Sequence, residues 1–94
     1  MFYTYIMASS TGVALYVGST DDLINRVFEH KNEIFEGHTK DYHIHKLVYY
    51  ETGESRESVK IRENKLKRWR RAWKQELITN FNPKWECLYS SLIK

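Results

Sequence analysis

The sequence predicts a single α+β domain in which a three-stranded antiparallel sheet is flanked by helices. Two observations favour this class: runs of aromatic and β-branched residues alternate with segments that carry an apolar stripe at helical spacing. A third is the length of 94 residues, which suits one compact unit. Because no repeat, low-complexity stretch or linker interrupts residues 1–94, we expect one domain over the whole chain.

The first two strands are expected to form a hairpin. Residues 2–7 and 13–18 have strand character, and the residues between them supply turn chemistry. Side chains alternate between the two faces of a strand, so Tyr16 and Gly18 share a face of the second strand. If the register brings that face together with the face of Tyr5, two phenols lie side by side, and Gly18 leaves open space beside Tyr16.

A helix is expected to follow the hairpin. Residues 19–22 offer hydroxyl and carboxylate caps, and an apolar stripe runs from Leu23 to Ile34. Arg26 and His30 lie one turn apart beside that stripe. A polar stretch then leads to a third strand at residues 46–51.

One long basic helix is expected from about Ser58 to Thr79. Glu63 and Arg70 fall in the same arc as its apolar residues, which are Val59, Leu66, Trp73 and Leu77. A carboxylate inside an apolar stripe is costly unless it has a partner or a metal. An ion pair of Glu63 with Arg70 or with Arg26 is the structural alternative to a metal. After Pro83, a short C-terminal element is expected to cover the core.

The charge of the chain is concentrated on this basic segment. Residues 56–74 hold nine Lys and Arg against two Glu, a balance of +7, whereas the whole chain carries only +3. Such concentration favours a polyanionic partner, although a solvated helix face would show the same pattern. The single Cys87 excludes an internal disulfide, and the spacing of the four histidines matches no strong zinc pattern. Without an apolar span or a leader, no membrane association and a cytoplasmic location are expected.

Several of these side chains suit the hydrolysis of a phosphodiester. Glu63 could hold one divalent cation, which acts as a Lewis acid and template. Arg26 could donate to the non-bridging phosphate oxygens. Tyr5 or Tyr16 could orient or deprotonate water if nearby cations stabilise a phenolate, because the ordinary pKa of tyrosine is about 10. Taken singly, each residue is equally well explained by packing or by an ion pair.

Taken together, the residues resemble the GIY-YIG endonuclease superfamily. The resemblance rests on Tyr3-Thr4-Tyr5, Tyr16-Val17-Gly18, Arg26, His30 and Glu63. Tyr3 and Thr4 replace the Gly and Ile of the first motif, and Val17 replaces the Ile of the second. The chain is most similar to the small free-standing bacterial members, whose pattern is echoed over residues 2–90 and as late as Asn82-Pro83-Lys84-Trp85.

The resemblance implies a role for each motif residue. The implied fold is the GIY-YIG nuclease-like sheet, with one Mg²⁺ or Mn²⁺ bound by the carboxylate of Glu63. Arg26 would be the catalytic arginine, and His30 would support whichever of Tyr5 and Tyr16 acts on the water. Gly18 matches the motif glycine. A late asparagine of the family is matched by Asn82, and Lys40 is a candidate phosphate contact.

The sequence therefore predicts a metal-dependent endonuclease that cleaves DNA. Lys60, Lys67, Arg68 and Arg71 point away from the apolar arc and are expected to meet backbone phosphates. For so small a chain, a branched or damaged DNA is a candidate substrate, and a protein partner is a candidate source of specificity. A role in DNA repair, an RNA target and the choice of metal stay open. The alternatives are a nucleic-acid-binding module of the same fold that does not cut, and an interaction domain that uses its tryptophans as anchors.

Overall fold

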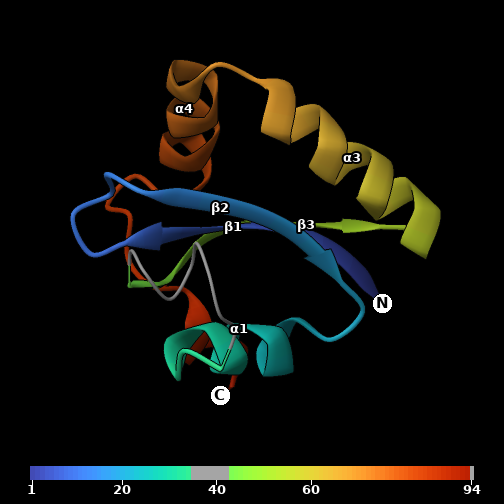
Figure 1. The fold of residues 1–94 in the computed structure, drawn as a ribbon, viewed down its shortest axis with the longest axis horizontal. Helices are drawn as coiled ribbons and strands as arrows, with labels where there is room; N and C mark the ends of the chain where they lie inside the picture. The colour runs from blue at the N-terminus through green and yellow to red at the C-terminus, as the bar shows by residue number, and fades with distance from the viewer. Residues whose placement is uncertain (35–42, 94) are drawn as a thin grey trace.

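The computed structural model describes residues 1–34 and 43–93, and it has the expected α+β architecture (Figure 1). Three antiparallel strands form one sheet in the order β2-β1-β3. The central strand is β1 (Phe2–Ser9), with β2 (Leu15–Thr20) on one side and β3 (Ile44–Gly53) on the other. The predicted fold class is thus confirmed, with β3 longer at both ends than expected.

The register of the hairpin brings the motif residues together. Tyr5 pairs with Gly18 and Met7 pairs with Tyr16. Paired residues on antiparallel strands project to the same face. The face that carries Tyr5 therefore also carries Tyr16, and the structure thus decides the register that the sequence left open.

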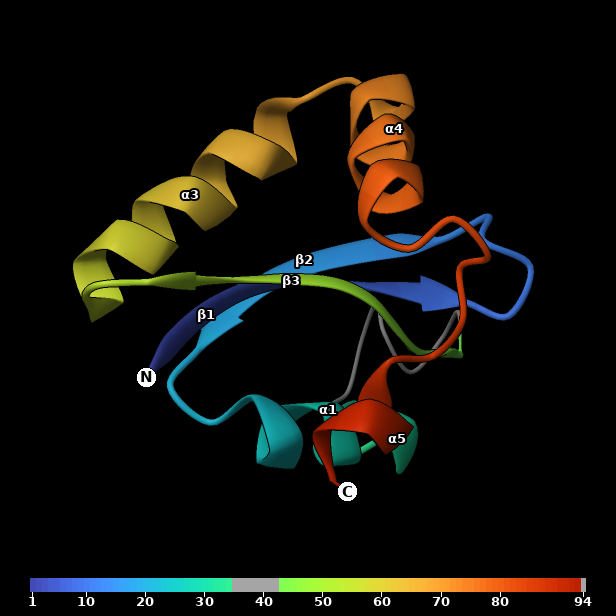
Figure 2. The ribbon, with the colours of Figure 1, turned by 180° about the vertical axis from the view of Figure 1, so that it is seen from behind.

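Different helices cover the two faces of the sheet (Figures 1 and 2). On the face of Tyr5 lie α1 (Leu23–Lys31) and the short α5 (Tyr89–Leu92), and on the other lie α3 (Arg56–Arg68) and α4 (Arg71–Phe81). The α1 side is packed by Tyr5, Met7, Leu23, Val27, Ile44 and Leu47, and the α3 side by Ile6, Ala8, Val17, Val48, Tyr49, Leu66 and Ile78. The sheet is thus the middle of three layers.

The single long helix expected over residues 58–79 is wrong. The backbone leaves the helix at Trp69, where ψ is 148°, and at Arg70, where ψ is 150°. Both residues are extended, so α4 starts in a new direction (Figure 1). In the sequence, the helical periodicity of apolar residues continues through Trp69 and Arg70. The chain turns there because Leu66 and Ile78 both pack on the same face of the sheet.

The start and end of α1 also differ from expectation. Ser19 and Thr20 belong to β2, and the cap is Asp22, whose carboxylate accepts from the N–H of Asn25. The helix ends at Lys31, so Ile34 lies beyond the apolar stripe and is exposed. In the part of the chain that the structure describes, no helix has the length and apolarity to cross a membrane.

Candidate active site

Tyr5 lies at the centre of the candidate site, and its ring passes directly beneath Gly18. A Cβ atom placed on Gly18 would lie 2.6 Å from both Cζ and Oη of Tyr5. The space that the sequence predicts beside Tyr16 is therefore filled by the second phenol. Only glycine allows this crossing of a strand by an aromatic ring.

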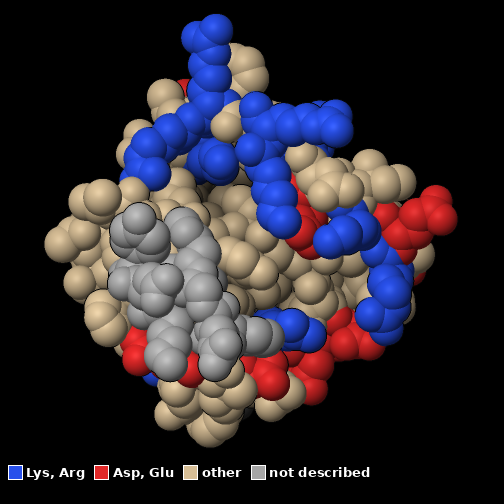
Figure 3. All heavy atoms as spheres, in the orientation of Figure 1, with Lys and Arg blue, Asp and Glu red and all other residues tan. Residues whose placement is uncertain are grey.

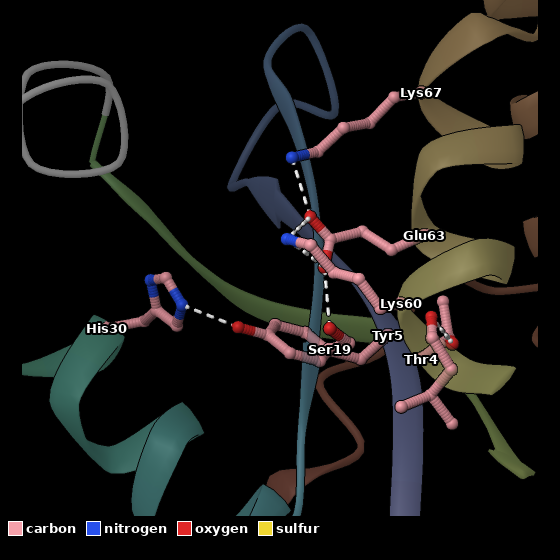
Figure 4. Close-up of polar contacts among 8 residues, drawn as sticks. Thr4, Tyr5, Ser19, His30, Lys60, Glu63 and Lys67 are labelled. Carbon is pink, nitrogen blue, oxygen red and sulfur yellow. Dashed lines mark hydrogen bonds and ion pairs between the residues drawn. The ribbon is translucent and has the colours of Figure 1, made fainter. Parts of the chain in front are cut away.

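The hydroxyl of Tyr5 contacts His30, which α1 carries into the same layer. Oη of Tyr5 lies 3.1 Å from Nε2 of His30, and the two side chains are buried (Figure 4). Burial, followed by the charges of Arg26 and His45, lowers the pKa of His30 to about 4. The imidazole is therefore neutral at pH 7, so Nε2 can accept the proton of the phenol.

Burial also keeps Tyr5 in its neutral form. It raises the pKa of Tyr5 well above the usual 10, and the neighbouring phenol of Tyr16 raises it further. The positive charge of Arg26 acts in the opposite direction, whereas Glu63 adds to the rise. A free phenolate at this position is thus unfavourable. If Tyr5 loses its proton, a neighbouring group such as Nε2 of His30 must take it up.

Tyr16 completes a cluster of three rings. Its ring centroid lies 5.0 Å from that of His30 and 6.3 Å from that of Tyr5. Unlike these two side chains, it is only partly buried, because β2 is an edge strand. Tyr16 is therefore the phenol nearer to solvent.

Arg26 lies one turn before His30 on α1, with its side chain 41% exposed. Its Nε lies 3.6 Å from Oε1 of Glu29. Its charge lowers the pKa of Tyr5 and of His30, so the guanidinium is within electrostatic range of both.

Glu63 is the buried carboxylate of the site, and α3 carries it on the opposite face of the sheet. Ser19 donates its hydroxyl to Oε1 at 2.6 Å, and Nζ of Lys67 lies 2.6 Å from Oε2 (Figure 4). Nζ of Lys60 lies 3.3 Å from the same oxygen. Burial works against ionisation, but the hydrogen bonds from Lys67 and Ser19 and the charges of both lysines outweigh it and lower the pKa of Glu63.

The two layers meet at the β2 edge of the sheet. Ser19 brings Glu63 against β2 from the α3 side, while Tyr5 reaches beneath the same strand from the α1 side (Figure 4). The pKa of Tyr5 responds to the charge of Glu63 as well as to that of Arg26. The carboxylate and the guanidinium thus act on the same phenol in opposite directions.

The donor set at Glu63 fits a hard divalent cation. A carboxylate and a hydroxyl supply only oxygen, which Mg²⁺ and Mn²⁺ prefer. The carboxylate is ionised, and both of its oxygens already attract ammonium groups. The carboxylate therefore attracts cations, and a metal ion would have to displace Lys60 and Lys67 from these oxygens.

The candidate phosphate contacts on the basic helices differ in their surroundings. Lys60 and Lys67 are half exposed but hold the carboxylate of Glu63. Arg68 is exposed, and Arg71 donates from Nη2 to the carbonyl of Gly12 in the hairpin turn at 2.8 Å. Lys and Arg side chains gather along α3 and the start of α4 above β2 (Figure 3). Lys40 lies outside the described residues.

Asn82 lies away from this edge and is held by main-chain groups. Its Nδ2 donates to the carbonyls of Val48 and Glu86, and its Oδ1 accepts from the N–H of Glu86. Val48 is on β3, the strand at the edge opposite β2. These contacts give Asn82 a structural role, in which it ties the C-terminal segment to the sheet.

The tryptophans are divided between core and surface. Trp69 and Trp85 pack against the core cluster on the α3 side, whereas Trp73 is 53% exposed. The tryptophans thus mostly stabilise the fold, as expected. Of the three, Trp73 alone is largely exposed, so the interaction surface stays an alternative without support from the burial of Trp69 and Trp85.

Sequence reasoning missed the residues that neutralise Glu63. The alternative expectation of an ion pair with Arg70 is wrong, since Arg70 lies in the break before α4 and is exposed. Lys60 and Lys67 are at i−3 and i+4 from Glu63, a spacing that is visible in the sequence. Ser19, in contrast, looked like a helix cap, and no local signal points to its contact with α3.

Comparisons with known proteins identify the family of the chain. Residues 1–76 match the family that is described as the GIY-YIG catalytic domain. The solution NMR structure of the UPF0213 protein BH0048 from Bacillus halodurans superposes with a TM-score of 0.51 at 26% identity, over 84% of each chain. No curated protein matches. The chain therefore belongs to the GIY-YIG family, whose catalytic domain implies nuclease-type hydrolysis of phosphodiester bonds.

Proposed function

We propose that this protein is a metal-dependent endonuclease that cleaves DNA at the β2 edge of its sheet. The observation that carries the proposal is that charged groups from both sides of the sheet act on the phenol of Tyr5. Its phenol bonds to neutral His30 and lies within range of both Arg26 and the ionised carboxylate of Glu63. In this proposal Tyr5 and His30 supply the base, Arg26 supplies the cation for phosphate, and Glu63 supplies the carboxylate for a metal.

The Tyr5–His30 pair is suited to take a proton from the attacking water. As the water oxygen bonds to phosphorus, its proton passes to Oη of Tyr5, and the phenol proton passes to Nε2 of His30. The raised pKa of Tyr5 makes this transfer favourable only when the second step accompanies the first. Tyr16, which is nearer to solvent, orients the water. The bond from phosphorus to the leaving oxygen breaks, and that oxygen takes up a proton from solvent.

Arg26 and Glu63 supply the electrostatic part of catalysis. The guanidinium of Arg26 donates to the non-bridging oxygens, where charge increases in the transition state. Glu63, helped by the hydroxyl of Ser19, would hold one Mg²⁺ or Mn²⁺. Such an ion supplies Lewis-acid stabilisation of the phosphate and the leaving oxygen.

The substrate is proposed to be held through its backbone. The exposed cations of α3 and α4 favour phosphates, and phosphate contacts position a strand without reading its sequence. Specificity would then come from the shape of the DNA, such as a branch or a damaged site, or from a protein partner.

A nicking assay tests the proposal. Purified protein is incubated with supercoiled and branched DNA in Mg²⁺ or Mn²⁺, and the wild type is compared with Glu63→Gln and Arg26→Ala. We expect each variant to lose about 10²–10³-fold in rate, the usual effect of removing one electrostatic group. Glu57→Gln, an exposed carboxylate on the same helix, is the matched control and should cut normally.

The alternative is a binding module of the same fold that does not cut. The contact of Lys67 with Glu63 favours it, since a permanent ammonium at the carboxylate would exclude a metal. This alternative predicts DNA affinity that falls with salt but no cleavage by the wild type. Cleavage that is equally fast in Glu63→Gln would reject the roles proposed here.

A further inference from the structure

A second group of metal-ligating side chains lies at the end of α1 and the start of β3. Nδ1 of His43 lies 2.6 Å from Oε2 of Glu33, and Nε2 of His45 lies 3.0 Å from the same oxygen. One ligand atom from each of the three residues falls within 4.8 Å of the others. None of them belongs to the site at Tyr5 and Glu63.

The two histidines reach Glu33 because of their place in the strand. His45 is the second residue of β3, and His43 comes two residues earlier, just before the strand begins. His43 is not extended: its φ is 50°, in the left-handed region, and this turn brings its imidazole to the same carboxylate oxygen that His45 contacts from the strand. Their rings are nearly perpendicular, at 80°, which allows both nitrogens to face one oxygen without stacking.

These distances are close to those around a bound zinc ion. Bonds of about 2.0–2.1 Å in a tetrahedral site place neighbouring ligand atoms roughly 3.3 Å apart. The contact of 2.6 Å would have to open by roughly 0.7 Å and that of 3.0 Å by roughly 0.3 Å. His43, whose side chain is 74% exposed, lies on the surface and can make this adjustment.

The ligand set also selects a different metal from the one expected at Glu63. Two imidazoles and a carboxylate form the three-ligand set that holds Zn²⁺ in open sites, where water takes the fourth position. Mg²⁺ prefers an all-oxygen set, such as that of Glu63 and Ser19. The partial exposure of Glu33 and His45 leaves room for that water.

We propose that Glu33, His43 and His45 form a transition-metal site that binds Zn²⁺ separately from the carboxylate of Glu63. The spacing of the histidines in the sequence does not indicate this site, because the third ligand, Glu33, comes from another part of the chain. Without a metal, the same residues would be a hydrogen-bonded group in which both imidazoles donate to the carboxylate. The proposal is independent of whether the protein cleaves DNA.

Zinc titration of the full chain tests this site. Metal-free protein without a histidine tag is titrated with Zn²⁺ by calorimetry and with Co²⁺ by absorption, which reports tetrahedral coordination. We expect one equivalent to bind. His43→Ala and Glu33→Gln should each weaken binding by more than the roughly 10–100-fold that loss of an outer-shell partner costs. Addition of Zn²⁺ should shift the imidazole nitrogen signals of His43 and His45 in wild-type NMR spectra.

Two control variants separate the proposed site from other carboxylates. Glu57→Gln removes an exposed carboxylate from α3, and Glu63→Gln removes the one in the candidate active site. Glu57→Gln should bind Zn²⁺ as the wild type does, and Glu63→Gln should keep the tetrahedral Co²⁺ spectrum that is assigned to Glu33, His43 and His45. The proposal is overturned if the wild type binds no Zn²⁺, if binding survives His43→Ala and Glu33→Gln, or if only Glu63→Gln abolishes it.

Discussion

At the scale of single residues, the candidate site depends on the absence of a side chain at Gly18. The ring of Tyr5 occupies the place where a Cβ atom would project. Because Tyr5 is only 1% exposed, its ring has no free space into which it could move. Close packing on both sides thus holds the phenol against His30.

Gly18→Ala should disrupt this contact. A Cβ atom 2.6 Å from the Tyr5 ring forces the ring or β2 to shift, at a cost of about 1–3 kcal/mol in the free energy of unfolding. Cleavage should fall by more than stability alone explains. Gly53→Ala is the matched control, since its Cβ would lie 2.5 Å from Val59, away from Tyr5. Equal cleavage by the two variants at equal stability would contradict the role of Gly18.

The protonation of His30 gives a second prediction at this scale. Its pKa is about 4 in the folded chain, against an ordinary value of 6.5. As the pH falls between these values, the unfolded chain binds the proton first, so protonation favours unfolding. The contribution of neutral His30 to stability should therefore be complete above roughly pH 6.5 and be lost as the pH falls to about 4.

Urea unfolding at a series of pH values measures this effect. The wild type should lose stability across that range, and His30→Gln should lose less. In imidazole NMR spectra, His30 of the folded protein should stay neutral well below the pH at which the urea-unfolded chain titrates. An ordinary titration of His30 in the folded state would show that burial does not hold it neutral.

At the scale of elements, α3 is positioned by contacts at several points along its length. Ser55 and Ser58 form a capping box at its start. The hydroxyl of Thr4 donates to the carbonyl of Val59 at 2.9 Å, and Leu66 is fully buried against the sheet. These contacts fix the position along β2 at which Glu63 reaches Ser19.

Ser55→Ala should therefore weaken the helix that carries Glu63. The variant removes the acceptor for the N–H of Ser58, at a cost of about 1 kcal/mol. For a domain of this size that corresponds to a fall of roughly 4–8 °C in Tm, which thermal unfolding measures. Ser55→Asp keeps an acceptor and should be close to the wild type. If Ser55→Asp loses as much as Ser55→Ala, the cap is not the cause.

At the scale of the whole molecule, positive charge is gathered on the layer formed by α3 and α4. Figure 3 shows Lys and Arg over these helices, while Asp and Glu lie mainly around the lower rim. The candidate carboxylate, Glu63, contacts β2 from this layer through Ser19. On the proposed function, a nucleic-acid backbone held by this surface would reach the β2 edge, where Ser19 contacts Glu63.

The affinity for DNA should depend strongly on salt. Each phosphate contact contributes about −0.9 to the slope of log K against log salt concentration. Arg68→Ala should make the slope shallower by about that amount, because Arg68 is an exposed cation on α3. Lys84→Ala changes the net charge equally outside the basic segment and should alter the slope less. Fluorescence anisotropy of labelled DNA without metal measures both, and equal slopes would place the contact surface elsewhere.

The elements of the fold were largely predictable, because their signals are local. Alternating aromatic residues predict β1 and β2 and the hairpin that joins them, whereas the register that pairs Tyr5 with Gly18 came from the structure. The break at Trp69 and Arg70 was not predictable in this way, since helical periodicity continues through it. Packing of α3 and α4 on one sheet face overrides that local preference.

The candidate site divides along the same line. Sequence motifs alone pointed to Tyr5, Tyr16, Arg26, His30 and Glu63 and to the family of the chain. Tertiary structure alone decided that the Tyr5 ring lies under Gly18, that Ser19 and Lys67 hold Glu63, and that Glu33 meets two histidines. The physical reason is that residue type and spacing encode chemistry along the chain, whereas burial, charge pairing and contact across strands depend on which elements pack together.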